Sequence, residues 1–157
     1  MKMTPETVAR QHEWVRDRGD RIVPLINDVR TELGERFETD VECVTHEQYR
    51  QVVDEVFADG DLAVNVAALV VMLRDLNVEG DYPGFIVDEL LGRELAGMLA
   101  GRQPFRLLGE ATFHYADVNI DRTDAGIDDL EAALAAGFQT RLPGWPWTET
   151  ESPFNTA

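Results

Sequence analysis

Residues 62–76 read LAVNVAALVVMLRDL, and this stretch decides the fold. Apolar side chains occupy nearly every position from Leu62 to Leu73, so a helix formed here has no polar face. A helix that is apolar on all sides is normally covered by other helices. We therefore predict that residues 62–76 form the central helix of the fold. The β-branched residues between Val64 and Val71 leave a buried strand as the alternative.

Amphipathic helices are predicted on both sides of this segment, because apolar residues recur at helical intervals of three and four. Start signals support several of them, including a Thr-Pro pair at Thr4 and a capping box at Thr45. The predicted helices cover residues 4–18, 22–33, 45–57, 85–100 and a last segment that begins at Thr123 or Asp124. The predicted fold class is therefore mainly α, a compact bundle of five to six helices around the central apolar one.

Two segments instead show the alternation of a β-strand with one wet face. In residues 37–44, Phe37 and Cys43 belong to an apolar set that alternates with acidic residues. Residues 105–115 alternate in the same way, although Leu108 and Gly109 interrupt the pattern. These segments predict a short two-stranded β element lying on the helices, and they leave the α+β class as the minor alternative to a mainly α fold.

The composition changes at residue 142. Residues 1–141 are predicted to form a single helical domain. Residues 142–157 contain three prolines and are predicted to form an extended tail. This tail also contains aromatic residues of the kind that anchor interfaces, namely Trp145, Trp147 and Phe154. We predict that these three residues bind a protein partner, and the alternative is that the tail folds back over its own helices.

The net charge restricts the class of partner. The 157 residues include 14 Lys and Arg against 30 Asp and Glu, which gives a formal charge of −16. Nucleic acids and anionic membranes are bound mainly through Lys and Arg, so neither is expected as a direct partner. We expect a protein partner, with a basic protein as the specific case that the charge suits, and a homo-oligomer remains open.

The composition also bears on compartment and origin. Cys43 is the single cysteine, so an intrachain disulfide is excluded, and the first residues lack the apolar segment of a secretory signal. Both observations predict a cytoplasmic protein. Lys2 is the only lysine beside 13 arginines. This bias is typical of a high-GC bacterium or one of its phages, with a halophilic archaeon as a further source.

The loop before the last predicted helix resembles the calcium loop of EF-hand and dockerin proteins. Asp117, Asn119, Asp121 and Asp128 stand at the spacing at which such loops place oxygen ligands. We predict that these four residues are the calcium ligands, if the chain binds calcium. Arg122 departs from the pattern, because a glycine normally permits the sharp turn there. The alternative is a polar loop whose carboxylates stabilise the start of the following helix.

Motifs of common enzymes are missing from the sequence. It contains no Walker-type phosphate loop, no Gly-x-Gly-x-x-Gly and no Gly-x-Ser-x-Gly. No cofactor is expected. The residues most suited to acid–base chemistry in a helical pocket are Cys43, Glu110, His114 and Tyr115. We predict a non-enzymatic acidic interaction protein, such as an accessory factor, adaptor or inhibitor encoded by a phage or mobile element. The alternatives are a small cofactor-free enzyme that uses these four residues and a calcium-binding module.

Overall fold

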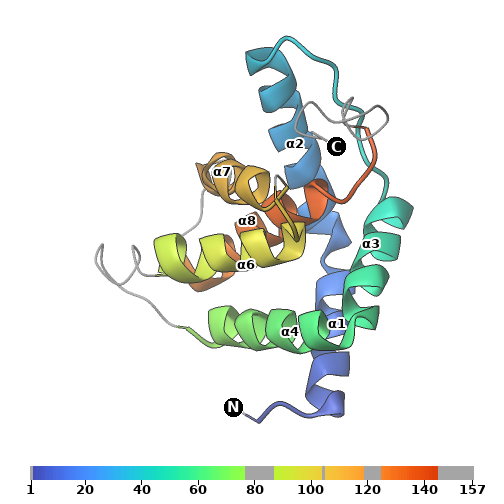
Figure 1. The fold of residues 1–157 in the computed structure, drawn as a ribbon, viewed down its shortest axis with the longest axis vertical. Coiled ribbons are helices and arrows are strands. Elements are labelled where there is room, and N and C mark those ends of the chain that lie inside the picture. The colour runs from blue at the N-terminus through green and yellow to red at the C-terminus, as the bar shows by residue number, and fades with distance from the viewer. Residues whose placement is uncertain (1, 77–86, 104, 119–124, 145–157) are drawn as a thin grey trace.

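The computed structural model describes residues 2–76, 87–103, 105–118 and 125–144 (Figure 1). Within these ranges all regular elements are helical, and η1 is a π-helical turn. The helices are α1 (Pro5–Asp17), α2 (Gly19–Arg36), α3 (His46–Ala58), α4 (Gly60–Asp75), η1 (Val87–Gly92), α6 (Arg93–Ala100), α7 (Phe105–Val118) and α8 (Ala125–Gln139). The prediction of a mainly α fold is confirmed. Figure 1 shows α1 and α2 following one another along the long axis of the molecule.

Side-chain caps begin three of the helices. The Thr4 hydroxyl oxygen accepts a hydrogen bond from the backbone N–H three residues later, at 3.1 Å. Thr45 and Gln48 form the two reciprocal bonds of a capping box at the start of α3. The carboxylate of Asp59 accepts a bond of 3.3 Å from the N–H of Leu62 at the start of α4. Caps of this kind each stabilise a helix by about 1 kcal/mol, because they satisfy N–H groups that have no partner within the helix.

The centre of the fold is α8. This helix contacts α2, α3, α4, η1, α6 and α7, and every residue from Asp128 to Thr140 is buried. The helix at residues 60–75, by contrast, has a wet side on which Val64 and Met72 are exposed. The prediction of a central helix at residues 62–76 is therefore corrected. The prediction relied on hydropathy, which is highest for the bulky apolar residues of α4. The helix that is buried on all sides is α8, which is rich in small residues.

Small side chains explain how α8 fits between so many neighbours. Four of its buried residues are alanines, at positions 132, 133, 135 and 136. At Gly137 the approach is closest, because a Cβ there would lie 2.5 Å from the Cβ of Leu99 and 3.0 Å from the carbonyl oxygen of Ala96. Protein interiors are packed to crystal-like density, so these two residues of α6 leave no room for a methyl group.

α3 and α4 meet at a sharp corner at Asp59, where their axes differ by 110°. Of the helices described, none by itself is long and apolar enough to cross a membrane. Only α3 and α4 together meet the length and composition of a span.

Neither segment predicted as a β-strand is one. Residues 37–44 connect α2 to α3 without regular structure, and Glu38 has a φ of 51°, which is incompatible with a strand. Phe37 is 71% exposed, so the expected apolar face does not exist. Residues 105–118 form the helix α7. Its buried residues lie at helical spacing but include small and polar ones, which hid the helical period: Gly109, Thr112, Phe113 and Ala116.

Arg30 joins α2 to the end of α8. This residue is 1% exposed, and its guanidinium donates hydrogen bonds of 2.6–3.2 Å to backbone carbonyls. The accepting carbonyls belong to Glu42, Gln139, Leu142 and Pro143. Burial lowers the pKa of Arg30 to about 10, so the side chain is a cation at neutral pH. The carbonyls that end a helix carry partial negative charge, which a buried cation stabilises.

The chain beyond α8 begins as part of the helical domain. Leu142 is 3% exposed, and Gly144 is buried against Arg30 and Glu42. The first three residues of the predicted tail are therefore packed on the domain. The remainder of the predicted tail, residues 145–157, lies outside the described residues.

Replacing Arg30 with methionine is expected to lower the free energy of unfolding by about 2–4 kcal/mol, because buried carbonyls lose their donor. Urea denaturation of both proteins measures the difference. Arg93→Met is the matched control, since Arg93 is exposed and its nitrogen lies 3.7 Å from Glu89. That pair contributes about 0.5 kcal/mol or less. Equal losses in the two variants would contradict the role assigned to Arg30.

Candidate functional site

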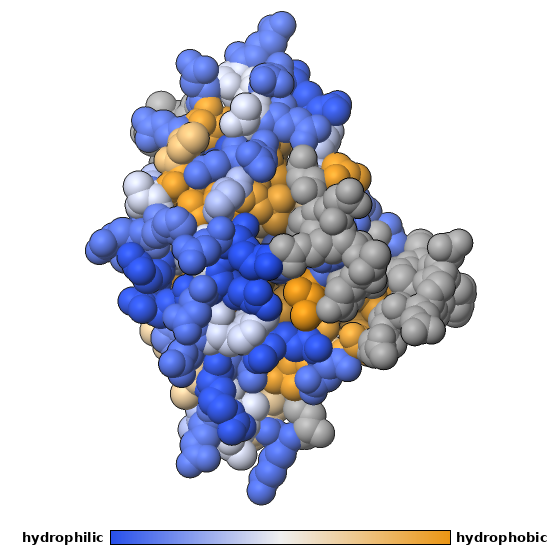
Figure 2. All heavy atoms as spheres, turned by 180° about the vertical axis from the view of Figure 1, so that it is seen from behind, coloured by the Kyte–Doolittle hydropathy of each residue, from blue (hydrophilic) through white to orange (hydrophobic). Residues whose placement is uncertain are grey.

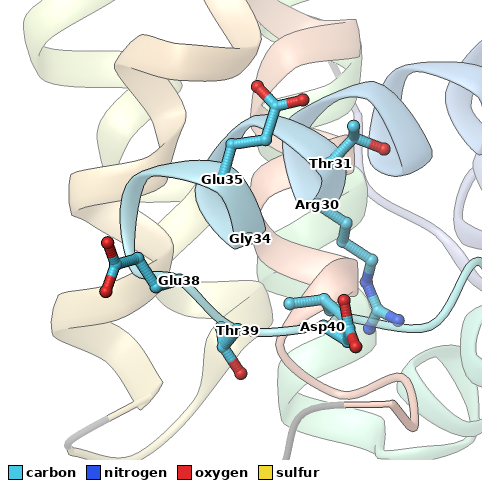
Figure 3. Close-up of a pocket in the computed structure, with 8 residues that line it drawn as sticks. Arg30, Thr31, Gly34, Glu35, Glu38, Thr39 and Asp40 are labelled. Atoms are coloured by element: carbon cyan, nitrogen blue, oxygen red, sulfur yellow. The ribbon is translucent and has the colours of Figure 1, made fainter.

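A hollow of about 420 Å³ lies where α2 ends and the connector to α3 begins (Figure 3). Three carboxylates line it, those of Glu35, Glu38 and Asp40, together with the hydroxyls of Thr31 and Thr39. Figure 3 shows the side chains of Glu35 and Glu38 directed outward in different directions around the rim. The hollow is therefore a concave surface ringed by negative charge.

The end of α2 places these carboxylates by a tight reversal of the chain. The N–H of Thr39 donates a hydrogen bond of 2.9 Å to the carbonyl of Gly34, and Glu38 between them adopts the left-handed conformation. This is the usual glycine-terminated end of a helix, with glutamate in the place of glycine. A Cβ at Gly34 would lie 2.6 Å from the carbonyl oxygen of Thr39, so glycine is required one turn earlier.

None of these three carboxylates forms an ion pair with a described Lys, Arg or His. Carboxylates elsewhere in the described structure do, as in the 2.9 Å contact between Arg21 and Glu131. A basic group brought to this rim would therefore find carboxylates with no counter-ion of their own. We call Glu35, Glu38 and Asp40 the acidic rim.

A second exposed surface lies on α7. Leu107 is 62% exposed and Val118 is 74% exposed, and Ala111 and His114 between them are also exposed. These four residues follow intervals of four, three and four, so they share one face of the helix. We call them the α7 face. Figure 2 shows the side of the molecule that faces away from the viewer in Figure 1. Hydrophilic residues predominate there, and apolar residues also reach the surface.

A larger hollow of about 600 Å³ lies between α1 and α4, and several of its lining residues hold these two helices together. Trp14 packs beneath the guanidinium groups of Arg18 and Arg74, at 4.3 and 4.4 Å, and Arg74 donates a hydrogen bond of 2.8 Å to Gln11. These contacts tie α1 to α4. The lining has as many basic as acidic residues, namely Lys2, Arg10 and Arg74 against Glu13, Asp17 and Asp75. This hollow therefore favours neither sign of charge.

The four residues proposed for acid–base catalysis do not share a buried pocket. Cys43 is exposed in the connector after α2. Glu110 accepts a hydrogen bond of 3.3 Å from Arg106, and Tyr115 lies 5.1 Å from the guanidinium carbon of Arg36. His114 is half exposed. The geometry expected of the small-enzyme alternative is therefore absent from these residues.

The predicted calcium ligands are only partly within the described structure. Asn119 and Asp121 lie outside the described residues. Asp117 is half-buried at the end of α7, where it shares a hydrogen bond with Asp129, and Asp128 is 6% exposed in α8. Within the described ranges, no group of three or more His, Cys, Asp or Glu is placed to hold a metal ion. Calcium binding stays a prediction.

The predicted partner-binding residues Trp145, Trp147 and Phe154 also lie outside the described residues. Sequence reasoning missed both the acidic rim and the α7 face. Glu38 and Asp40 of the rim were interpreted as part of the wet side of the predicted strand at residues 37–44. The α7 face was visible only as a 4-3-4 spacing inside a segment interpreted as a strand.

Replacing Glu38 with glycine is expected to stabilise the protein by about 0.5–1 kcal/mol, because a non-glycine residue in the left-handed region is strained. In a protein of this size this corresponds to a rise in Tm of about 1–4 °C. Thermal unfolding followed by circular dichroism measures the change. Asp40→Gly is the control, since Asp40 has no positive φ and is expected to lose stability. A lower Tm for Glu38→Gly would contradict the strain argument.

The carboxyl group of Asp117 is expected to make stability depend on pH. Burial raises its pKa above the usual 3.8, while the hydrogen bond with Asp129 and the charge of His114 act in the opposite direction. A raised pKa means that the folded state retains the proton, so stability falls as pH rises from about 4 through the raised value.

Asp117→Asn is therefore expected to raise Tm near neutral pH and to leave it unchanged near pH 3. The measurement is the difference in Tm between variant and wild type across this pH range. Asp28→Asn, at an exposed carboxylate, provides the control. A difference in Tm that is constant with pH would show that Asp117 does not titrate in this way.

Comparison with known proteins identifies a family along the whole chain. No curated protein matches the sequence, and no solved structure matches it. The matching family model is described as a domain of unknown function (DUF7984), and it spans residues 1–157. The chain therefore belongs to the DUF7984 family.

Proposed function

We propose that this protein is a non-enzymatic interaction protein that binds a basic protein partner. The observation that carries the proposal is the acidic rim, in which Glu35, Glu38 and Asp40 line one hollow with the buried guanidinium of Arg30 and none of the three forms an ion pair with a described residue. Like charges gathered on a chain of net charge −16 raise the free energy of the free protein. A basic surface placed against the rim lowers this free energy and accelerates the association of the two proteins.

The shape of the rim favours a macromolecule over a single ion. Calcium requires six to eight oxygen atoms converging on one point. The carboxylates of Glu35 and Glu38 instead diverge around the hollow (Figure 3). Several Lys or Arg side chains on a protein surface can each form an ion pair with one of these diverging carboxylates.

Two further expectations accompany this proposal. We propose a cytoplasmic location, because Cys43 is an exposed free thiol and such thiols persist in a reducing compartment. We also propose that Trp145, Trp147 and Phe154 add apolar anchors to the contact. Their position in the sequence supports this, since Arg30 fixes the chain just before them, at Leu142 and Pro143, beside the hollow that it helps to line.

The test compares wild type with the triple variant Glu35→Gln, Glu38→Gln and Asp40→Asn. Affinity capture from a lysate of the source organism is expected to retain a protein of basic pI on the wild type. The triple variant is expected to retain at least tenfold less of it. Raising NaCl from about 50 to about 500 mM is expected to release the partner, because salt screens surface charges.

The control variant changes the net charge equally but elsewhere. It carries Glu13→Gln, Asp28→Asn and Glu55→Gln, three exposed carboxylates that form no ion pair with a described residue. This control is expected to retain the partner. Equal loss from both variants would show that overall charge, and not the rim, attracts the partner. Retention of the same protein by the rim variant would refute the proposal.

A further inference from the structure

We propose that the α7 face docks an amphipathic helix of the partner protein, one with an apolar seam and basic flanks. The inference rests on the proposed function and names the element that the partner presents. The α7 face consists of Leu107, Ala111, His114 and Val118, and all four are exposed. An uncharged face, apart from one histidine, is unusual on a chain with 30 acidic residues.

The spacing of the α7 face is that of a helix-pairing seam. Two helices pack lengthwise when apolar residues recur at alternating intervals of three and four. Residues 107, 111, 114 and 118 follow these intervals, with His114 as the one polar member. α7 has 14 residues and is therefore about 21 Å long, enough for three turns of a partner helix. The opposite side of α7 is occupied already, since Gly109, Phe113 and Ala116 are buried in the molecule.

Two other exposed apolar residues are sequence neighbours of residues that contact α7. Leu90 is 57% exposed and follows Glu89, whose carboxylate oxygen lies 3.9 Å from the imidazole nitrogen of His114. On the side of α2, Phe37 is 71% exposed and follows Arg36, whose guanidinium lies over the ring of Tyr115. The four most exposed large apolar residues in the described structure are thus on α7 or beside residues that contact it. Exposed apolar residues gathered in one region of a protein favour a site of interaction there.

Charge decides what kind of helix fits. In the sequence, Phe37 stands between Glu35 and Glu38 of the acidic rim, whose carboxylates form no ion pair with a described residue. Lys or Arg on the flanks of a docked helix would meet these carboxylates, as charged flanks do in helix pairs. A second copy of this chain would bring the same carboxylates and a further net charge of −16, so like charges oppose self-pairing.

The experiment uses a labelled synthetic helix of about 18 residues, with leucines at alternating intervals of three and four and lysines on both flanks. Its binding to the full-length protein is measured by fluorescence anisotropy. Leu107→Ser combined with Val118→Ser is expected to weaken binding at least tenfold. Val64→Ser combined with Met72→Ser is the matched control, because both side chains are exposed apolar residues of α4. This control is expected to bind within twofold of wild type.

A second peptide tests the charge argument. It keeps the leucines and replaces each lysine with glutamate, and it is expected to bind at least tenfold more weakly than the first. Equal binding of the two peptides would overturn the basic-flank requirement. No binding of the lysine peptide, or equal weakening by the α4 control variant, would overturn the docking face itself. All variants are checked for unchanged helix content by circular dichroism.

Sedimentation measurements test whether the α7 face is occupied by a second copy of this chain. Self-association of the wild type that is abolished by Leu107→Ser and Val118→Ser would show that a second copy occupies the α7 face, which overturns the inference. Failure of the proposed function looks different, since in that case the acidic-rim variant would retain the captured basic protein. A basic partner that depends on the rim but not on Leu107 and Val118 would leave the proposed function standing and refute the docked helix.

Discussion

The hydrogen bonds of Arg30 with backbone carbonyls are the constraint on which the rest of the architecture depends. One guanidinium on α2 holds the last turn of α8, the chain that follows it and the connector before α3. A buried cation is costly unless its donors are satisfied, and here the last carbonyl of α8 accepts one bond while carbonyls of the two adjoining segments accept the others. Because α8 is the enclosed helix, fixing its end also fixes the frame into which α4, α6 and α7 pack. The acidic hollow lies beside the same guanidinium, so the frame of the fold and the candidate site share a residue.

Local chemistry was predictable from sequence, and packing was not. Thr4 and Thr45 begin helices because their side chains bond the backbone within three residues, which the sequence displays directly. The identity of the central helix depends on the space between helices, and Gly137 shows its role only beside Leu99. α7 was mistaken for a strand for the same reason, since Gly109 and Thr112 face its neighbours without being strongly apolar. Hydropathy measures how much a residue avoids water, whereas these positions are selected for how little room they occupy.

The acidic rim combines local strain with unbalanced charge. Glu38 occupies a backbone conformation that glycine adopts without cost, and the carboxylates beside it repel one another. Both features oppose stability, and neither is required for α2 to end, since glycine at residue 38 would end it as well. Strained, like-charged surfaces of this kind cluster where a protein meets a ligand. In the complex that we propose, charge sets the orientation and rate of the encounter, and apolar contact with the α7 face supplies its lifetime.

The central position of α8 also has a consequence for synthesis. α8 is the last described helix to leave the ribosome, yet the apolar sides of α2, α4, α6 and α7 are closed by it. Translation proceeds at about 5–20 residues per second, so the interval between the end of α4 and the end of α8 is roughly 3–13 s. During that time the nascent chain exposes an open apolar groove. The decisive step of folding is therefore expected to wait until α8 has been synthesised, and until then the groove is a substrate for chaperones that bind exposed apolar segments.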